Sequence, residues 1–328
     1  MPTREITLSS SAGTGSNWST AVGHSTEKLG AVFFSSAGHT PSALELRGPA
    51  RERVCATDEG TAMDDLEICR GYRRRILEVS QMLDALHVAP AFSCLEIVDA
   101  VLRRSMDSPS GGADSFILSK GHGAMAHYVV LEGLGVLEPE QVNRISQKGS
   151  RIGGHPDRGT PGIVASTGSL GHGLPIALGI ARGQRERARL GRVFVVMSDG
   201  ELMEGSVWEA LLLGPSLGIT NVTIIIDHNG SISRGDIAAV QPNLLPVAPK
   251  LAAFGWDTCE VEGHDSAAIV AAINGAQSSA PRAIVAHTTK GKGVSFMENQ
   301  PIWAYRSPSP AEYQQALAEL AMPAANHA

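Results

Sequence analysis

The sequence lacks three features that would each indicate a class of protein. Its 27 lysines and arginines are outnumbered by 33 aspartates and glutamates, giving a net charge of −6, so we expect no basic face for nucleic acid. No stretch reaches the ~18 consecutive apolar residues of a membrane-spanning helix. The N-terminus has no apolar segment behind a basic start, which argues against a secretory signal. These absences predict a cytoplasmic protein that binds neither nucleic acid nor a membrane.

Cysteine is scarce as well. The four cysteines lie far apart and form neither a C-x-x-C pair nor a zinc-binding spacing. We therefore expect reduced thiols, most of them inside the protein, rather than disulfides or a zinc site. Glycine is abundant instead: 36 glycines among 328 residues predict a backbone that often turns tightly or approaches another group closely. The cysteines are Cys55, Cys69, Cys94 and Cys259.

Residues 1–60 differ in composition from the rest of the chain. They are rich in Ser, Thr and Gly without a period, and then charged, which predicts a flexible N-terminal extension. From Met63 onward, apolar runs and helical patterns alternate without an internal repeat. The length suffices to bury a proper core, and we expect one domain over residues 61–328.

The apolar pattern also predicts the order of helices and strands. Short apolar runs bounded by turns indicate strands, and apolar residues at helical spacing indicate helices. A capping box of Ser93 and Glu96 predicts the start of one helix, which runs through Arg104. The alternation is typical of an α/β fold, a parallel sheet with helices on both faces. The expected strands are 115–119, 193–197, 222–226 and 283–288, and further helices are expected at 63–86 and 174–190.

Two polar residues follow successive strands of this expected sheet. Asp199 comes after the first apolar run of "VFVVMSDG", and Asn229 ends the later run "TIIIDHN". In open parallel sheets, ligands bind at the carboxyl ends of the strands, so we expect both side chains at one edge. Their oxygens suit Mg²⁺ or Ca²⁺, which share their ligand shell with phosphates, and the main chain near Ser231 could supply a third ligand.

A plainer interpretation exists for each of these residues alone. Asp199 could be a helix N-cap and Asn229 a turn residue, because these residue types dominate caps and turns. Gly200 and Glu204 lie between them, however, and a glycine at this place lets the backbone approach an anion. The start of the following helix would favour a diphosphate. Together these features favour the metal site.

Four stretches of the sequence resemble the transketolase family, in the order that the family has them. They span about 63–320 and match the N-terminal half of transketolase, which binds thiamine diphosphate and is a separate subunit in the split enzymes. The resemblance implies the thiamine-diphosphate-binding fold. The stretches are "SKGHGAMAHYVVLEGLG", "GGHPDRGTPGIVASTGSLGHGLPIALGIA", "SDGELMEGSVWEA…TIIIDHNG" and "TTKGKGVSFMEN".

The resemblance implies roles for individual residues. His122 would lie beside the phosphate and thiazolium side of the cofactor, and His155 would bind the hydroxyketone end of the donor. His87 matches the first active-site histidine, and Glu204 matches a carboxylate that links two sites. The implied catalytic residues are His87, His122, His155 and Glu204; the cofactor-binding residues are His122, Gly168, Ser169, Leu170, Asp199, Gly200, Glu201 and Asn229; the metal ligands are Asp199, Asn229 and Ser231.

The sequence also departs from the family at three places. Ser198 precedes the Asp-Gly pair where the family has glycine, a difference that split transketolases often show. Around His87 the family is rich in glycine, whereas this chain reads "LHVAPAF", so the backbone there must follow different angles. Ala304 stands where the family has a histidine, which removes a hydrogen-bond donor near the diphosphate. The last two differences lead us to expect a specialised acceptor, such as a bulky non-sugar carbonyl. We expect three further histidines, His127, His172 and His264, to be structural.

The resemblance implies an enzyme that works only with a partner. The chain would be the N-terminal subunit of a two-component transketolase, which moves a two-carbon ketol unit from a ketose or ketose phosphate to an aldehyde or ketone. The partner would carry the pyrimidine-binding domain and its catalytic glutamate, most simply in an α₂β₂ assembly. Two alternatives stay open: a decarboxylating subunit, such as that of a deoxyxylulose-phosphate synthase, and a degenerate half that regulates a partner.

Overall fold

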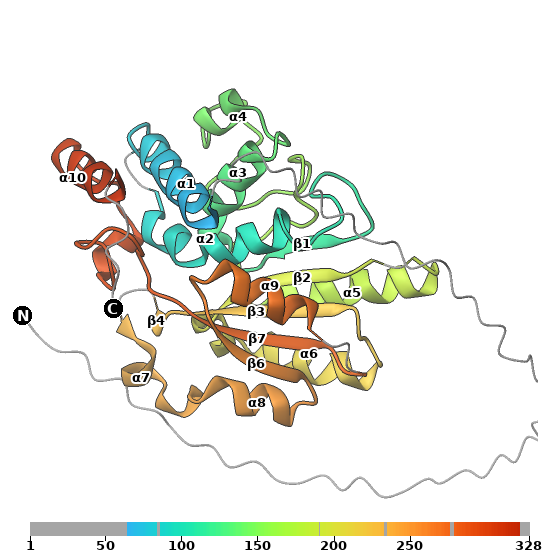
Figure 1. Ribbon diagram of the computed structural model, residues 1–328. Coiled ribbons are helices and arrows are strands. Elements are labelled where there is room, and N and C mark those ends of the chain that lie inside the picture. The colour runs from blue at the N-terminus through green and yellow to red at the C-terminus, as the bar shows by residue number, and fades with distance from the viewer. Residues whose placement is uncertain (1–63, 84–85, 190, 233–234, 276–278, 322–328) are drawn as a thin grey trace, which may run out of the picture. The chain divides into compact units, whose positions relative to one another are not determined.

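Five parallel strands form the central sheet. The computed structural model describes residues 64–83, 86–189, 191–232, 235–275 and 279–321, so the expected extension over 1–60 lies outside the described residues. The strand order is β1-β2-β3-β7-β6, and each neighbouring pair is parallel (Figure 1). The expected parallel sheet is confirmed. The strands are β1 Ser115–Leu118, β2 Val193–Ser198, β3 Val222–His228, β6 Asp257–Glu262 and β7 Arg282–His287.

The central strands bury both of their faces. In β2, Phe194 and Val196 enter one core cluster, whereas Val195 and Met197 enter a second cluster on the opposite side of the sheet. This alternation follows from the period of two in a strand. A strand that is covered on both faces needs apolar residues at every position, which is why β2 and β3 read as unbroken apolar runs.

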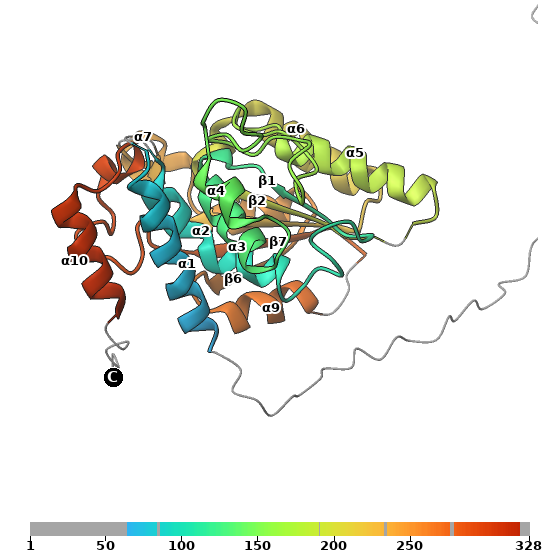
Figure 2. The ribbon, with the colours of Figure 1, turned by 90° about the horizontal axis from the view of Figure 1, so that it is seen from above.

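Helices cover both faces of the sheet. One core cluster packs α1, α2, α3, α9 and α10 together, and the other packs α5, α6 and α8. Figure 1 shows α1, α2 and α3 on one side of the sheet and α8 on the other, and Figure 2 shows α10 beside α1. The helices are α1 Asp65–Ser80, α2 Val88–Leu102, α3 Ala124–Gly133, α4 Pro139–Asn143, α5 Gly173–Glu186, α6 Gly205–Ser216, α7 Ile237–Val240, α8 Val247–Ala253, α9 Ser266–Asn274 and α10 Pro310–Ala321.

The expected capping box at Ser93 and Glu96 is wrong. The helix α2 begins at Val88, and Ser93 lies inside it, where its hydroxyl donates to Asp227 at 2.8 Å. Glu96 forms a buried ion pair with Arg73. Every residue of α2 is buried, so tertiary packing sets the start of this helix rather than a local cap.

Other boundaries differ from expectation by a few residues, and three strands were missed: β6 of the central sheet and the two short strands β4 Ser231–Ile232 and β5 Gly235–Asp236, which pair with each other. The first helix ends at Ser80, six residues before the expected end at Leu86, and α5 ends at Glu186 instead of residue 190. The edge strand β6 was not expected, because its sequence "DTCEVE" is polar and only partly buried. An edge strand pairs on one side only and needs fewer apolar residues.

Two sequence expectations concern the cysteines and the membrane. Cys69, Cys94 and Cys259 are free thiols, the first two of them buried, while Cys55 lies outside the described residues. Burial raises the pKa of the Cys94 thiol to about 12, so this thiol stays protonated. None of the helices in the described ranges has the length and apolar character to cross a membrane.

His127 on α3 is a buried histidine, as expected for a packing residue. Its ring meets the ring of Phe116 edge to face at a centroid distance of 4.8 Å, and neither ring nitrogen has a hydrogen-bond partner. Burial lowers the pKa of His127 to about 3. The unfolded chain binds this proton below its ordinary pKa of about 6.5, so the free energy of unfolding must fall as the pH drops from 6.5 toward 3.

We predict that His127→Leu stabilises the protein and weakens its acid sensitivity. In the wild type, this one group should lower the free energy of unfolding by about 2 kcal/mol between pH 7 and pH 5. The variant should lose that contribution and gain about 1–3 kcal/mol at pH 7, because two unpartnered nitrogens leave the core. Urea unfolding at both pH values measures this, with the exposed His287→Asn as a control. An unchanged pH dependence in His127→Leu would contradict the prediction.

Candidate cofactor site

A cavity of about 390 Å³ opens at the carboxyl ends of the strands, within the usual size range of small-molecule sites. Segments that follow β1, β2, β3 and β7 all line it, because parallel strands end at the same edge of the sheet. The residues expected from the sequence that line it are His87, His122, His155, Gly168, Leu170, Gly200, Glu204, Asn229 and Ser231.

Three histidines gather on one side of this cavity. The ring centroid of His87 lies 6.3 Å from that of His122 and 5.9 Å from that of His155. Burial, together with the neighbouring charges, lowers the pKa of His122 well below its usual range and also lowers that of His155. Both rings are therefore neutral at pH 7 and can donate or accept a hydrogen bond.

His87 keeps its place at the cavity although the surrounding glycines of the family are missing. It precedes the first residue of α2, and its Nδ1 lies 2.5 Å from the carbonyl oxygen of Ala304. A carbonyl oxygen can only accept, so Nδ1 carries a proton, and in the neutral ring Nε2 is then the acceptor. Ala304 is itself buried and lines the cavity. The contact fixes both the tautomer of His87 and the main chain at Ala304.

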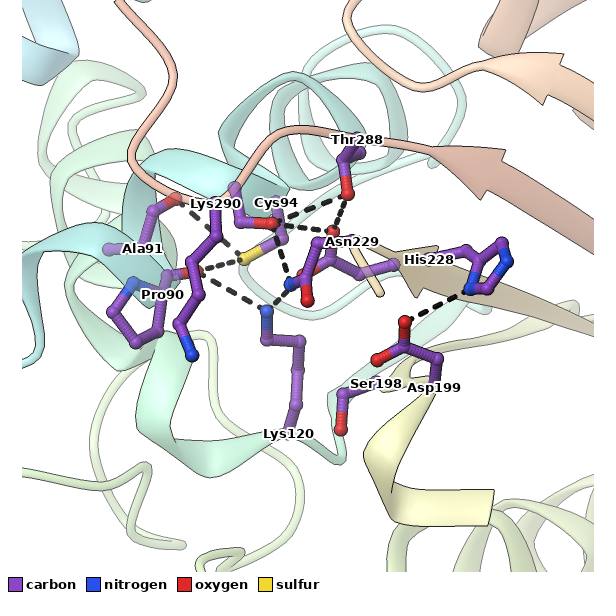
Figure 3. A network of polar contacts seen from close by, with 12 residues as sticks. Pro90, Ala91, Cys94, Lys120, Ser198, Asp199, His228, Asn229, Thr288 and Lys290 are labelled. Carbon is purple, nitrogen blue, oxygen red and sulfur yellow. Dashed lines mark hydrogen bonds and ion pairs between the residues drawn. The ribbon is translucent and has the colours of Figure 1, made fainter. Parts of the chain in front are cut away.

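Asp199 and Asn229 lie at the ends of adjacent strands, as expected. Asp199 is fully buried, and its Oδ2 accepts a hydrogen bond from the Gly230 main chain at 2.7 Å. The same oxygen accepts from Nδ1 of His228 at 3.0 Å, the bond drawn in Figure 3. The side-chain oxygen of Asn229 accepts from the main chain of Ser231 at 2.9 Å. These bonds hold the segment after β3 against the end of β2.

The oxygens at these strand ends fit a magnesium ion better than a transition metal. In the described part of the chain, no group of three or more His, Cys, Asp or Glu side chains is arranged to hold a metal. The chain would offer one carboxylate from Asp199, the amide oxygen of Asn229 and the main chain near Ser231. Mg²⁺ is usually bound through one or two carboxylates and the phosphates of its ligand, which matches this sparse set.

A buried ion pair, which the sequence did not predict, lies at the cavity, and its Lys120 is one of the lining residues. The side chains of Lys120 and Asp227 contact each other, and both are fully buried. Asp227 also accepts hydrogen bonds from the hydroxyls of Ser93 and Thr288, and Lys120 donates to the carbonyl oxygen of Pro90 at 3.3 Å. The pair thereby connects the ends of β1, β3 and β7 to α2.

Lys290 adds a second cationic side chain to the cavity. It is 5% exposed, and its Nζ lies 3.3 Å from the hydroxyl of Ser231. Burial and the nearby charge of Lys120 lower the pKa of Lys290. A bound anion would relieve this repulsion, so the cavity favours a negatively charged ligand such as a diphosphate. Both lysines could have been recognised from the sequence, since Lys120 and Lys290 lie in stretches that resemble the family.

Glycines bring the main chain close to the cavity. Gly168 has φ +142°, and a Cβ there would lie 3.2 Å from the ring of His155. Gly200 lines the cavity, and a Cβ there would lie 2.6 Å from Ile232. The amide of Gly200 donates to Asp199 at 2.8 Å, so it orients that carboxylate rather than pointing freely at an anion. A larger side chain at either glycine would displace a neighbour.

Three of the expected residues do not line the cavity: Ser169, Asp199 and Glu201. The buried carboxylate of Glu201 instead accepts hydrogen bonds from the hydroxyl of Ser119 and from the main chain of Gly171 at 2.8 Å. Glu201 therefore holds the loop that carries Gly168 and Leu170. Of the histidines expected to be structural, His172 is exposed at the start of α5, and its Nδ1 lies 3.0 Å from the carbonyl oxygen of Leu170.

Comparison with known proteins decides the family. A family model described as "Transketolase, thiamine diphosphate binding domain" matches residues 85–303. The chain is 34% identical over 255 residues to an apulose-4-phosphate transketolase subunit of Phocaeicola vulgatus, covering 76% of this chain and 90% of that one. It is 32% identical to the 6-deoxy-6-sulfo-D-fructose transketolase subunit SqwG of a Clostridium species, covering 70% and 86%. The chain belongs to the transketolase family.

Solved structures agree with this assignment. The transketolase of Leishmania mexicana matches with a TM-score of 0.73 at 25% identity, over 79% of this chain and 42% of that one. This transketolase-family chain thus spans less than half the length of that transketolase, but most of the length of the two transketolase subunits named above. The matches confirm the resemblance and the fold that the sequence predicted.

We predict that the free energy of unfolding depends on the absence of an unpaired buried charge more than on the attraction between Lys120 and Asp227. Asp227→Asn leaves Lys120 buried without a counter-charge and should lower the free energy of unfolding by about 3–5 kcal/mol. Adding Lys120→Met should restore most of that loss, because no uncompensated charge remains. Urea unfolding of both variants measures this. A loss below about 1 kcal/mol in the single variant would contradict the account.

Proposed function

We propose that this chain is the N-terminal subunit of a two-component transketolase, which transfers a two-carbon ketol unit from a ketose or ketose phosphate to an aldehyde or ketone. One observation carries the proposal: Asp199 and Asn229 end adjacent strands beside a cavity that also holds two lysines, in a chain of the transketolase family. Thiamine diphosphate, when bound, would supply the carbanion chemistry of the reaction.

The residues of this chain would bind and orient the cofactor. We assign a divalent ion, Mg²⁺ or Ca²⁺, to Asp199, Asn229 and the main chain at Ser231, as their hard oxygens suggest. Lys290 would balance the charge of the diphosphate, since burial already disfavours its own charge without an anion. His122 would lie beside the same end of the cofactor.

The neutral histidines suit proton transfer on hydroxyl groups. His87 presents Nε2 as an acceptor because Nδ1 is bonded to Ala304, so it can take a proton from a substrate hydroxyl. His155 would bind the hydroxyketone end of the donor. Glu204, which also lines the cavity, would link this site to that of another subunit. A histidine that is neutral at rest can accept and return a proton close to pH 7.

We propose only the chemical class of the substrates: a ketose or ketose phosphate as donor, and an aldehyde or ketone as acceptor. The relatives named above are transketolase subunits for two different sugars, so family membership leaves the sugar open. Ala304, where the family has a histidine, offers only a methyl group to the cavity, and on this ground we keep the specialised acceptor expected from the sequence as part of the proposal. The decarboxylating alternative is not favoured by these relatives, and the regulatory alternative is decided by assay. A cytoplasmic location stays a prediction.

We expect a partner protein with the pyrimidine-binding domain and its catalytic glutamate, in an α₂β₂ assembly. The match to proteins that are themselves named as single subunits of a transketolase supports a partner. The helix α6 offers an apolar surface for it, because Leu212 and Leu213 are 61% and 48% exposed and Leu217 is exposed beside them. Large apolar side chains clustered in solvent usually mark an interface.

We predict that Leu212→Glu combined with Leu213→Glu prevents assembly. Burying two charges at the interface would cost far more free energy than losing a contact at its rim. The association constant should therefore fall by at least about 100-fold. Sedimentation of this chain mixed with its partner measures the association. Leu66→Glu, on α1 across the sheet, is the control and should assemble normally. Normal assembly of the double variant would place the interface elsewhere.

We predict that Asp199→Asn weakens cofactor binding in the assembled complex by at least about 10-fold, because it removes the one carboxylate of the metal site. Calorimetric titration with thiamine diphosphate and Mg²⁺ measures the affinity, and ketol transfer from a ketose measures the activity. Asp107→Asn, in an exposed loop, is the control. Wild-type affinity in Asp199→Asn would contradict the assignment of the metal site.

The wild-type complex decides between the alternative functions in the same assay. Tight Mg²⁺-dependent binding with cleavage of a ketose supports the proposed transferase. Release of CO₂ from a 2-oxoacid would instead establish the decarboxylating alternative. A complex that forms but consumes neither substrate would establish the regulatory half.

A further inference from the structure

Arg73, Glu96 and His264 form a buried network beside the cavity, although they are far apart in sequence. Two guanidinium nitrogens of Arg73 on α1 contact the two carboxylate oxygens of Glu96 on α2, at 2.6 and 2.9 Å. Nδ1 of His264, in the loop after β6, lies 3.0 Å from the same carboxylate. Arg73 and Glu96 are 3% and 4% exposed. We call these three residues the Arg73–Glu96–His264 network.

The hydrogen bonds of His264 fix its tautomer. The main-chain amide of Thr289 donates to Nε2 of His264 at 2.8 Å, so Nε2 carries the lone pair. Nδ1 therefore carries the proton and donates it to Glu96. Burial opposes the charge of Glu96, but Arg73 and His264 outweigh it and lower the pKa of this carboxyl to about 2. Within the network, the neutral ring of His264 thus lies between an ionised carboxylate and a main-chain donor.

The network touches the loop after β7 at two places. One is Thr289, through His264. The other is Gly293, which has φ +93° and whose Cβ, if present, would lie 3.3 Å from the side chain of Arg73. Lys290 lies between these two points in the chain. The network therefore holds this loop by a hydrogen bond at Thr289, and Arg73 lies close to Gly293 on the other side of the lysine that lines the cavity.

Other hydrogen bonds also hold this loop, among them one from the amide of Gly293 to the carboxylate of Glu298 at 3.0 Å. The Thr288 hydroxyl donates to Asp227, the carbonyl oxygen of Lys290 accepts from Asn299 at 2.8 Å, and the amide of Gly291 donates to Ala89 at 3.1 Å. None of these bonds uses the amide of Thr289. Without an acceptor at His264, that amide would lose its partner next to Lys290, and the loop would no longer be held at this point.

We propose that His264 is a positioning residue: it fixes residues 288–293 so that Lys290 faces the cavity, and it thereby sets the affinity for the anionic ligand without touching it. The inference rests on the proposed function in taking that ligand to be thiamine diphosphate. It goes beyond the sequence expectation, which treated His264 as structural only.

Two substitutions test the hydrogen bonds of the two ring nitrogens of His264 separately. In His264→Gln the amide oxygen reaches the region of Nε2 and can accept from Thr289, but the contact with Glu96 is lost. In His264→Asn the shorter amide lies near Nδ1 and can donate to Glu96, but Thr289 loses its acceptor. A role limited to satisfying the buried Glu96 would favour the Asn variant, whereas positioning of the loop favours the Gln variant.

The first readout is ligand affinity in the assembled complex, titrated with thiamine diphosphate and Mg²⁺. We expect His264→Asn to weaken binding by about 10-fold and His264→Gln to stay within about threefold of the wild type. Ile76→Ala, a core variant of α1, controls for lost stability and should bind normally. The inference is overturned if the Asn variant binds as the wild type does, or if Gln and Asn lose equal affinity.

The second readout does not depend on the cofactor. Amide hydrogen exchange over residues 288–293 should be about fivefold faster in His264→Asn than in the wild type, as for one lost hydrogen bond, and nearly unchanged in His264→Gln. Unchanged exchange in the Asn variant overturns the inference even if the wild type binds thiamine diphosphate. Failure of the wild type to bind would overturn the proposed function, and the exchange data would still decide the role of His264.

Discussion

The buried contact between Lys120 and Asp227 is the constraint on which the cavity depends. Each charge alone would be costly in the core, so the two must stay together and keep their remaining hydrogen bonds. Asp227 is also bonded to Ser93 on α2 and to Thr288 after β7. Three strand ends and one helix are thereby held in a single arrangement, and the cavity opens where these segments meet.

This arrangement places an acidic and a basic side chain near each other at the cavity. Asp199, fully buried, accepts hydrogen bonds from two main-chain amides and from a histidine, and these bonds orient its carboxylate at the end of β2. Lys290 lies beside Ser231, with its charge disfavoured by burial. A divalent ion with a diphosphate complements both groups at once, since the ion needs oxygen ligands and the phosphates need cations. The neutral His155 and the tautomer of His87 then leave hydrogen-bonding nitrogens for a substrate.

The sequence predicted those residues of the site that directly follow a recognisable apolar run. Asp199 and Asn229 could be found because each follows an apolar run, and parallel strands bring such ends together. The partnership of Lys120 with Asp227 could not, because the residues are 107 positions apart and neither stands out alone. The start of α2 was misjudged for a related reason: Ser93 looked like a local cap but is bonded across the fold. Likewise, the contact of His264 with Thr289 exists only once β6 and β7 are paired.

The central claim is that Asp199 and Asn229 hold the divalent ion of a diphosphate cofactor. A crystal structure of the complex grown with Mn²⁺ and thiamine diphosphate tests it most directly, because manganese gives an anomalous signal that locates the ion without interpretation of its ligands. The account predicts one anomalous peak within bonding distance of the Asp199 carboxylate and the Asn229 amide oxygen, next to the diphosphate. A cofactor bound without this peak, or with manganese coordinated by other residues, would contradict it.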